Sequence, residues 1–323
     1  MTLKDMNGIQ LIRRISSGYW ACRLLLTASK YDVFELLEKP MTARAVAGSL
    51  SLDSRATEIL LDAVTALGFL RKSGNRYRNS RVSSRFLVKG KPYYQGDILM
   101  HHAFLYERWS ELDEIVKTGR PSRKGRDHSS FIKGMHNIAS LRSKEVISLI
   151  NIDGVRRVMD LGGGPGTYSV EFAKKGLDVT LCDLKETFRI SEEIISSCRF
   201  RGKVSFLPAD FMTDDIGSGY DLVFISQIIH MLGEKDIVRL FRKAGRSLNN
   251  GGRIVVQELL VNDRHTGPLQ GALFAVNMLV NTGGGRTYSP SEISGFLRKA
   301  GYTSVRKTLL QETVLMEARK PAG

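Results

Sequence analysis

The sequence predicts an α/β fold in which a mostly parallel sheet, covered by helices on both faces, follows an α-rich N-terminal part. Strand and helix segments alternate after residue 150, which is typical of a parallel sheet with crossover helices. Before residue 150 the apolar positions recur mainly at helical spacing. A chain of 323 residues is long enough for about two domains of ordinary size.

The N-terminal part begins with two segments, 9–29 and 31–38, whose apolar residues recur at helical spacing. Thr42 can cap a short helix after them, and Asp53 or Ser54 can cap a second one. We expect this second helix to bury one apolar face, made of Ile59, Leu60, Ala63, Val64 and Leu67.

A β-hairpin is predicted directly after this helix. Gly68 ends the helix, and Ser73-Gly74-Asn75 is a hairpin turn signal between the flanks Phe69-Leu70 and Arg76–Arg78. Helix, turn, helix and hairpin in this order form a winged-helix pattern.

Two further helices are predicted at 95–118 and 130–150, with the polar loop GRPSRKGRDHSS between them. We therefore divide the chain into a winged-helix domain (1–95), a helical linker (96–150) and an α/β domain (151–323).

The α/β domain contains five predicted strands and then two closing strands, the last of which we expect to run antiparallel. The five are Arg157–Asp160, Asp178–Leu184, Val204–Asp210, Asp221–Ser226 and Arg253–Leu259, and the closing pair is TSVRKTLLQ and ETVLMEARK. A helix before the fifth strand carries one apolar stripe of Ile237, Leu240, Phe241, Ala244 and Leu248. In such sheets ligands bind at the carboxyl ends of the strands, near the point where the strand order reverses.

Composition excludes several classes of protein. The start, MTLKDMNGIQ, has no signal-peptide core, and the longest uncharged stretch, 266–285, contains five glycines and a proline, which suit a membrane span poorly. Three scattered cysteines, Cys22, Cys182 and Cys198, argue against a disulfide framework or a zinc site. We expect a cytoplasmic protein without a membrane segment or a metal.

The net charge of +15 raises the question of nucleic acid. The excess is spread along the chain, and only segment 71–91 is strongly one-sided, with eight Lys or Arg and no acid. This segment could contact phosphates as the wing of a winged helix.

A glycine turn follows the first predicted strand, in VMDLGGGPGTY at 158–168. A P-loop needs a Lys directly after its last glycine, but the first Lys here is Lys174. No choice among Gly162, Gly163, Gly164 and Gly166 gives the glycine offsets of the dinucleotide fingerprint. Asp160 would repel a pyrophosphate and attract the sulfonium and ammonium of S-adenosylmethionine. We therefore predict that the turn binds S-adenosylmethionine.

Two more acids end the next two predicted strands. Asp183 is placed to accept ribose hydroxyls, although its spacing alone suits NAD equally well. Asp210 can accept from the adenine amino group, with Phe211 against the ring. Each acid by itself could instead cap a helix. Three acids at three consecutive strand ends favour cofactor binding.

With these motifs the chain resembles class I S-adenosylmethionine-dependent methyltransferases, specifically the small-molecule O-methyltransferase family that includes caffeate-type and acetylserotonin-type enzymes. VMDLGGGPGTY, FLPADF, SQIIHMLGEKD and VNTGGGRT match the blocks of that family in order. The resemblance implies a Rossmann-like sheet and a winged-helix domain that serves dimerisation, hence a homodimer. It also implies S-adenosylmethionine as cofactor, S-adenosylhomocysteine as product, and no metal.

The resemblance implies a catalytic pair, in which His230 is the general base and Glu258 orients it. Phe131 and Met135 of FIKGM match positions that line the acceptor pocket in plant relatives. Together with the acids above, the predicted cofactor-binding set is Asp160, Gly162, Gly163, Gly164, Gly166, Asp183, Leu184, Asp210, Phe211, Ser226 and Gln227.

A predicted uncharged helix at 266–282 follows the fifth strand and could wall the acceptor site, although core packing is an equal alternative for it. Its candidate acceptor residues are Phe274, Asn277, Met278 and Asn281. Apolar lining would suit an aromatic or polyketide-like acceptor.

The chain departs from the family blocks at three places. His230-Met231-Leu232 stands where many relatives have His-Asp-Trp, and Ser226 replaces a Lys common in plant enzymes. The block GGKERT carries a second Glu that orients the catalytic His, but GGGRT offers only Gly285 there.

The expected reaction is methyl transfer to a hydroxyl of an aromatic or polycyclic small molecule. The methyl group is already activated, so the enzyme mainly aligns the reactants. A phenol with pKa about 10 is a weak nucleophile at neutral pH, and an imidazole base typically adds about 10²–10⁴-fold to the rate.

Two alternatives stay open. One is C-methylation of a quinone or tetrapyrrole-like ring, in which His230 would deprotonate or orient a ring substituent. The other is a regulator that binds DNA in response to S-adenosylmethionine. The intact glycine turn, the presence of His230 and the single Arg of TARAVAGSL weigh against this regulator.

Overall fold

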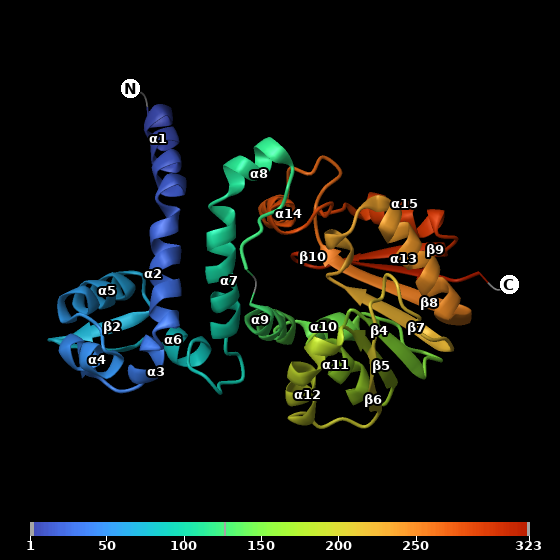
Figure 1. Cartoon of the computed structure of the whole chain (residues 1–323), viewed down its shortest axis with the longest axis horizontal. Coiled ribbons are helices and arrows are strands. Elements are labelled where there is room, and N and C mark those ends of the chain that lie inside the picture. Colours follow the sequence, from blue (N-terminus) through green and yellow to red (C-terminus); the bar gives the residue numbers. More distant parts are fainter. Residues whose placement is uncertain (1–2, 126, 322–323) are drawn as a thin grey trace. The chain divides into compact units, whose positions relative to one another are not determined.

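The computed structural model of the chain describes residues 3–125 and 127–321. These residues fall into two compact units that divide between Leu105 and Tyr106 (Figure 1). The helix α7 (Gly96–Trp109) crosses the division.

The first unit has the predicted order of helices and a hairpin. Thr42 Oγ1 caps α4 by accepting from Ala45 N at 3.2 Å, and Asp53 Oδ1 caps α5 by accepting from Ala56 N at 2.7 Å. The strands form one antiparallel sheet in the order β1-β3-β2. The elements are α1 (Leu3–Ser16), α2 (Gly18–Lys30), α3 (Val33–Leu36), β1 (Met41–Thr42), α4 (Ala43–Leu50), α5 (Ser54–Ala66), β2 (Leu70–Ser73), β3 (Arg76–Asn79) and α6 (Arg81–Phe86).

The predicted core face of α5 was partly wrong. Thr57, Leu61 and Val64 are buried, whereas Ile59 and Leu67 are exposed. The helix has apolar residues on two sides, and the buried side is the one that meets the core of Phe34, Leu37, Val46 and Tyr77.

Large apolar side chains are exposed along α1 and α2. Ile12, Ile15 and Trp20 are 67%, 69% and 62% exposed, respectively, and Leu11 and Tyr19 are exposed as well. Large exposed apolar side chains grouped on two consecutive helices are typical of a surface that binds a partner.

The basic segment 71–91 is partly neutralised within the first unit. Lys72 pairs with Asp62, Lys89 with Asp32 and Lys91 with Glu38, at 2.7, 2.7 and 3.1 Å. Segment 71–91 therefore carries less free positive charge than its sequence indicates, although only Lys72 of the three lies in the hairpin.

The second unit is built on a seven-stranded sheet in the order β6-β5-β4-β7-β8-β10-β9. All neighbouring pairs are parallel up to β8, and β10 runs antiparallel to both β8 and β9. This confirms the predicted fold class. The strands are β4 (Arg157–Leu161), β5 (Asp178–Asp183), β6 (Lys203–Pro208), β7 (Tyr220–Ser226), β8 (Leu248–Leu259), β9 (Thr303–Leu309) and β10 (Thr313–Arg319).

Helices cover both faces of this sheet (Figure 1). The side chains of Val146, Phe172 and Phe224 belong to a core on the face of α10 and α11, and those of Phe241 and Phe296 to a core on the face of α13 and α15. The helices are α8 (Leu112–Thr118), α9 (His128–Ser140), α10 (Ser143–Ser148), α11 (Thr167–Lys174), α12 (Phe188–Ser196), α13 (Glu234–Ser247), α14 (Leu269–Asn281) and α15 (Pro290–Lys299), with short 3-10 turns η1 (Lys185–Thr187) and η2 (Ile229–Met231).

The apolar stripe predicted for α13 is buried as expected at Ile237, Leu240, Phe241 and Ala244. Within the described ranges, no helix combines the length and apolar character needed to cross a membrane.

Candidate functional site

The glycine turn lies at the point where the strand order reverses. It follows β4, which sits between β5 and β7 in the sheet. Gly162, Gly164 and Gly166 have φ values of 70°, 49° and 74°, a left-handed conformation that glycine adopts at little cost. A Cβ on Gly164 would meet nothing within 4 Å. At Gly164 the turn therefore presents bare backbone to open space, at the usual ligand position of such sheets.

Asp160 is buried directly beneath this turn. It is 1% exposed, accepts from Ser169 Oγ at 2.6 Å, and would lie 2.8 Å from a Cβ on Gly163. Burial, and secondarily the charge of Asp183, raise the pKa of Asp160 to about 7. A cation near the turn would relieve this penalty, because it stabilises the charged carboxylate.

Asp183 joins the end of β5 to the glycine turn. Its Oδ2 accepts from Gly164 N at 2.8 Å, and its Oδ1 accepts from Leu184 N at 2.7 Å and from Thr187 Oγ1 at 3.2 Å. Burial raises the pKa of Asp183, and the three donors act in the opposite direction. Since a carboxylate offers about four lone pairs, acceptor capacity remains for a ribose hydroxyl.

Asp210 and Phe211 follow the third strand rather than ending it. The strand β6 stops at Pro208, so the predicted range was two residues too long; Asp210 Oδ1 instead accepts from Met212 N at 2.8 Å in a tight turn. The Phe211 ring lies beside the glycine turn, because a Cβ on Gly162 would meet its Cε1 at 3.4 Å.

The end of β7 has a strained backbone. Gln227 has φ of 58°, which is uncommon for a residue with a side chain, and its N–H donates to Gln257 O at 2.9 Å. Ser226 Oγ donates to Gln257 Oε1 at 2.9 Å. Strain of this kind clusters at functional sites.

His230 and Glu258 form the buried pair that the sequence indicated. His230 Nδ1 lies 2.7 Å from Glu258 Oε2, and Glu258 Oε1 accepts from Ile229 N at 2.9 Å. Both residues are buried. A carboxylate beside Nδ1 favours a proton on that nitrogen, which leaves Nε2 as the basic atom of a neutral ring.

The ring of Phe274 packs against His230. The two planes meet at 84°, with ring centroids 4.9 Å apart. At the position expected for a second orienting Glu, a Cβ on Gly285 would lie 2.3 Å from His230 O.

The other predicted acceptor residues of α14 are engaged in helix packing. Asn281 Oδ1 accepts from Arg108 Nε at 2.6 Å, and Asn277 Oδ1 accepts from Trp109 Nε1 at 2.9 Å. Met278 is buried in the core.

The helix α9 carries Phe131 and Met135, which are four residues apart and thus on one face. It also contacts the helical segments that follow the glycine turn and β5: His136 Nδ1 lies 2.8 Å from Thr167 Oγ1, and His128 Nε2 lies 3.4 Å from Thr187 Oγ1.

These residues fit S-adenosylmethionine. The open backbone at Gly164, the free acceptor capacity of Asp183 and the buried acid Asp160 suit its methionine part, ribose and positive charge, respectively. In the part of the chain that the structure describes, no three His, Cys, Asp or Glu side chains gather to hold a metal ion.

The sequence did not point to Ser169, Thr187 or Ile228. Ser169 donates to Asp160, and Thr187 donates to Asp183. Ile228 fills the space that a side chain on Gly162 would need. Ser169 and Thr187 stand shortly after motif residues, so position offered a weak signal. Ile228 offered none, because an apolar residue after a strand is normally part of the core.

The chain matches two known families in order. Residues 14–89 match the O-methyltransferase dimerisation domain, and residues 115–303 match the O-methyltransferase domain. It is similar to 3-hydroxy-5-methyl-1-naphthoate 3-O-methyltransferase of Streptomyces sahachiroi, with 32% identity over 92% of this chain and 90% of that protein. It is also similar to L-tyrosine C(3)-methyltransferase of Streptomyces lavendulae, with 26% identity over 92% of this chain and 87% of that protein.

A solved structure has the same fold. The crystal structure of human N-acetylserotonin methyltransferase, in complex with S-adenosylmethionine, superposes with a TM-score of 0.89 at 24% identity and covers 99% of this chain and 100% of that one. The two family matches and the 32% identity over nearly the whole length show that the chain belongs to the S-adenosylmethionine-dependent O-methyltransferase family with an N-terminal dimerisation domain.

Proposed function

We propose that this enzyme methylates a hydroxyl on an aromatic or polycyclic small molecule, with His230 as general base. The observation that carries the proposal is the 2.7 Å contact of His230 Nδ1 with Glu258 Oε2. It leaves Nε2 as the atom that takes the proton of the acceptor hydroxyl while the oxygen attacks.

The cofactor supplies a methyl group on a sulfonium, which needs no further activation. Asp183 would accept from its ribose, the glycine turn would hold its methionine part, and Asp160 would favour its positive charge. Asp210 and Phe211 would receive the adenine, and Leu184, Ser226 and Gln227 would complete the walls. The protein's own contribution is alignment and removal of one proton.

The acceptor would lie between α9 and α14, against Phe131, Met135 and Phe274. Aromatic and thioether side chains of this kind suit a flat apolar ring system. The relative from Streptomyces sahachiroi is named for 3-hydroxy-5-methyl-1-naphthoate, so we choose 3-hydroxy-1-naphthoate, which has the hydroxyl and carboxylate at the same positions, as the first acceptor to assay.

C-methylation is the second candidate, because one relative is named as a C-methyltransferase that acts on tyrosine. There His230 would remove a proton from a ring hydroxyl, and the neighbouring ring carbon would take the methyl group from the sulfonium as the bond from methyl to sulfur breaks. Loss of the hydrogen on that carbon, with return of a proton to the oxygen, would then restore the aromatic ring. The two products have the same mass, so the labelled product is heated in hydriodic acid before mass spectrometry: an aryl O-methyl ether loses its label, and an aryl C-methyl group keeps it.

We also propose a homodimer. The match to a dimerisation domain and the exposed apolar side chains of α1 and α2 support it.

The test of the general base is His230→Ala, assayed with labelled S-adenosylmethionine. We expect turnover to fall by about 10²-fold or more while cofactor affinity stays nearly unchanged. Near-normal turnover would refute the role of His230 and leave alignment as the source of catalysis.

A further inference from the structure

The ring of His230 is held on two sides by different means. Glu258 holds Nδ1 by a hydrogen bond of 2.7 Å, and the Phe274 ring stands at 84° to the imidazole with centroids 4.9 Å apart. We propose that Phe274 is a positioning residue for His230. It takes the orienting role that the second Glu has in relatives with the block GGKERT. The proposal rests on the proposed role of His230 as base.

No side chain can orient His230 from position 285. A Cβ on Gly285 would lie 2.3 Å from His230 O and 2.8 Å from Met231 Cα. Both are backbone atoms, which cannot move aside as a flexible side chain can. The backbone at Gly285 therefore lies too close to η2 for a glutamate side chain at this position. The orientation of the imidazole must be fixed by another residue.

A single hydrogen bond does not fix the orientation of an imidazole ring. The bond from Nδ1 to Glu258 sets the distance of that nitrogen, but the imidazole can still tilt about the line that joins the two atoms. An aromatic ring packed edge-to-face resists such a tilt, because the favourable contact depends on the angle between the planes. Phe274 thus limits the direction in which Nε2 points.

Phe274 can do this only if α14 is itself fixed, and its C-terminal end is. Arg108 Nε donates to Asn281 Oδ1 at 2.6 Å, Trp109 Nε1 donates to Asn277 Oδ1 at 2.9 Å, and Ser122 N donates to Val280 O at 2.9 Å. Arg108 is 3% exposed, so its side chain makes its bond to Asn281 largely away from solvent.

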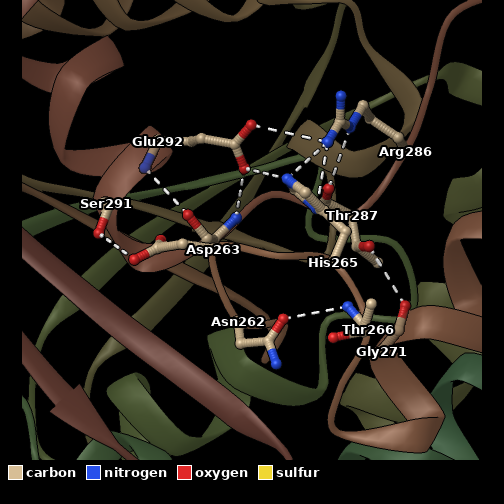
Figure 2. A network of polar contacts seen from close by, with 10 residues as sticks. Asn262, Asp263, His265, Thr266, Gly271, Arg286, Thr287, Ser291 and Glu292 are labelled. Atoms are coloured by element: carbon tan, nitrogen blue, oxygen red, sulfur yellow. Dashed lines mark hydrogen bonds and ion pairs between the residues drawn. The ribbon is translucent and has the colours of Figure 1, made fainter.

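The N-terminal end of α14 is fixed as well. A Cβ on Gly271 would lie 2.1 Å from Leu260 O, so the helix touches the chain that follows β8. Thr287 Oγ1 donates to Gly271 O at 3.2 Å (Figure 2). Phe274 lies between the two anchored ends.

The segment that supplies Thr287 is held in turn by a polar network (Figure 2). Arg286 donates to His265 Nε2 at 2.7 Å and pairs with Glu292 at 3.7 Å, while His265 lies 3.5 Å from the same Glu292. The loop before α14 and the segment after it are therefore joined to one another. This restrains the position of the helix, and with it the position of Phe274 relative to His230.

The test compares variants at 274 that keep or lose the aromatic ring. We expect Phe274→Leu to lower kcat with 3-hydroxy-1-naphthoate by roughly 3- to 10-fold, the range that one edge-to-face contact allows. The cofactor Kd should stay within twofold, the fall should appear in kcat even if the acceptor KM also rises, and Phe274→Tyr should restore most of the rate. Leu273→Ala, on the exposed side of α14, is the matched control and should leave kcat unchanged.

A double-mutant cycle shows whether Phe274 acts through His230. In a His230→Ala background, Phe274→Leu should have no further effect on turnover. An additive loss, or a raised acceptor KM at constant kcat, would overturn the proposal and make Phe274 an acceptor wall only. If His230→Ala alone keeps full turnover, the proposed function has failed instead, so the two failures are distinct.

An acceptor-free measurement completes the test. Nitrogen-15 NMR of the six histidines reports the tautomer of each ring, and His230→Ala identifies the signal of His230. Glu258 should keep the proton on Nδ1 in all three proteins, so the Nε2 signal is the readout. We expect a single sharp Nε2 signal in the wild-type protein and in Phe274→Tyr, and a shifted, broadened one in Phe274→Leu because the ring tilts. An unchanged Nε2 shift and line width in Phe274→Leu would overturn the positioning role, whatever the acceptor.

Discussion

Glu258 makes two hydrogen bonds with its two carboxylate oxygens: Oε2 lies 2.7 Å from His230 Nδ1, and Oε1 accepts from Ile229 N at 2.9 Å. One oxygen orients the ring and the other fixes the backbone turn η2 that carries it. Both partners are donors, so the site requires an acceptor at each position.

Glu258→Gln should reverse the tautomer of His230. Gln has one oxygen, which can satisfy either Ile229 N or His230 Nδ1. If the oxygen stays with Ile229, the amide NH₂ faces Nδ1 and moves the ring proton to Nε2, where the base is needed. We expect kcat to fall by about 10²-fold or more, with unchanged cofactor affinity in calorimetry.

The exposed Glu312→Gln is the control for this charge change and should behave as wild type. Because no second carboxylate is present at Gly285, Glu258→Gln should cost more here than in a relative that keeps both acids. An equal loss in the two proteins would contradict this comparison.

Asp183→Ala should weaken S-adenosylmethionine binding sharply. The substitution leaves ribose hydroxyls without a charge-assisted acceptor, and it also frees Gly164 N and Leu184 N of their partner. Titration calorimetry should show at least a tenfold increase in Kd, of the size a lost charge-assisted bond produces. NAD should bind neither form; tight NAD binding without S-adenosylmethionine binding would refute our interpretation of the turn.

The sequence predicted the sheet and the glycine turn because each follows from the pattern of neighbouring residues. It predicted the His230–Glu258 pair because both residues match family blocks. It did not predict how the α14 amides are used. Asn277 and Asn281 accept hydrogen bonds from Trp109 and Arg108, respectively, which lie more than 160 residues earlier in the chain. Helical spacing predicts which residues share a face of a helix, but it does not predict which distant segment packs against that face.

The same limit explains the error at α5. Ile59 and Leu67 repeat at helical spacing as well as Thr57, Leu61 and Val64 do, so periodicity alone leaves two candidate core faces. Only the packing of the whole unit decides between them. The domain limits 1–95, 96–150 and 151–323 stay predictions.

Asp160→Asn should stabilise the fold and weaken cofactor binding. Below pH 4 the acid is protonated in both the folded and unfolded states. Between pH 4 and 7 the unfolded chain ionises while the folded protein resists, because the pKa is raised to about 7. Stability is therefore lost as the pH rises through this window, on the order of 4 kcal/mol in total.

Denaturant unfolding at pH 5 and pH 8 measures this loss, and Asp160→Asn should remove it while Asn accepts from Ser169 as Asp does. Since the positive cofactor favours the ionised acid, wild-type affinity for S-adenosylmethionine should rise between pH 5 and 7. The affinity of Asp160→Asn should vary less with pH and be weaker at pH 8. Tighter binding by the variant at pH 8 would show that Asp160 does not attract the cofactor.

The hairpin of the first unit should not retain duplex DNA. Arg71 and Arg78 face each other across the hairpin, but the three ion pairs of segment 71–91 with Asp62, Asp32 and Glu38 reduce its field. Non-specific binding depends on phosphate neutralisation and falls steeply with salt. Gel shift with a random duplex at low salt should show no complex, and salt-sensitive retention would reopen the regulator hypothesis.

Ile15→Glu should dissociate the proposed dimer. Ile15 on α1 is 69% exposed, and Ile12 and Trp20 beside it in sequence are exposed to a similar degree. A stable interface buries about 1,200–2,000 Å² in total, and a charge buried at its centre without a partner is strongly unfavourable. Light scattering at micromolar concentration should give twice the chain mass of 36.0 kDa for the wild type and a lower mass for Ile15→Glu.

Val116→Glu on α8, which is equally exposed at 69% but lies outside the dimerisation domain, should keep the wild-type mass. A wild-type monomer would remove the homodimer, and equal effects of the two variants would show that general solubility, rather than this surface, is what changed.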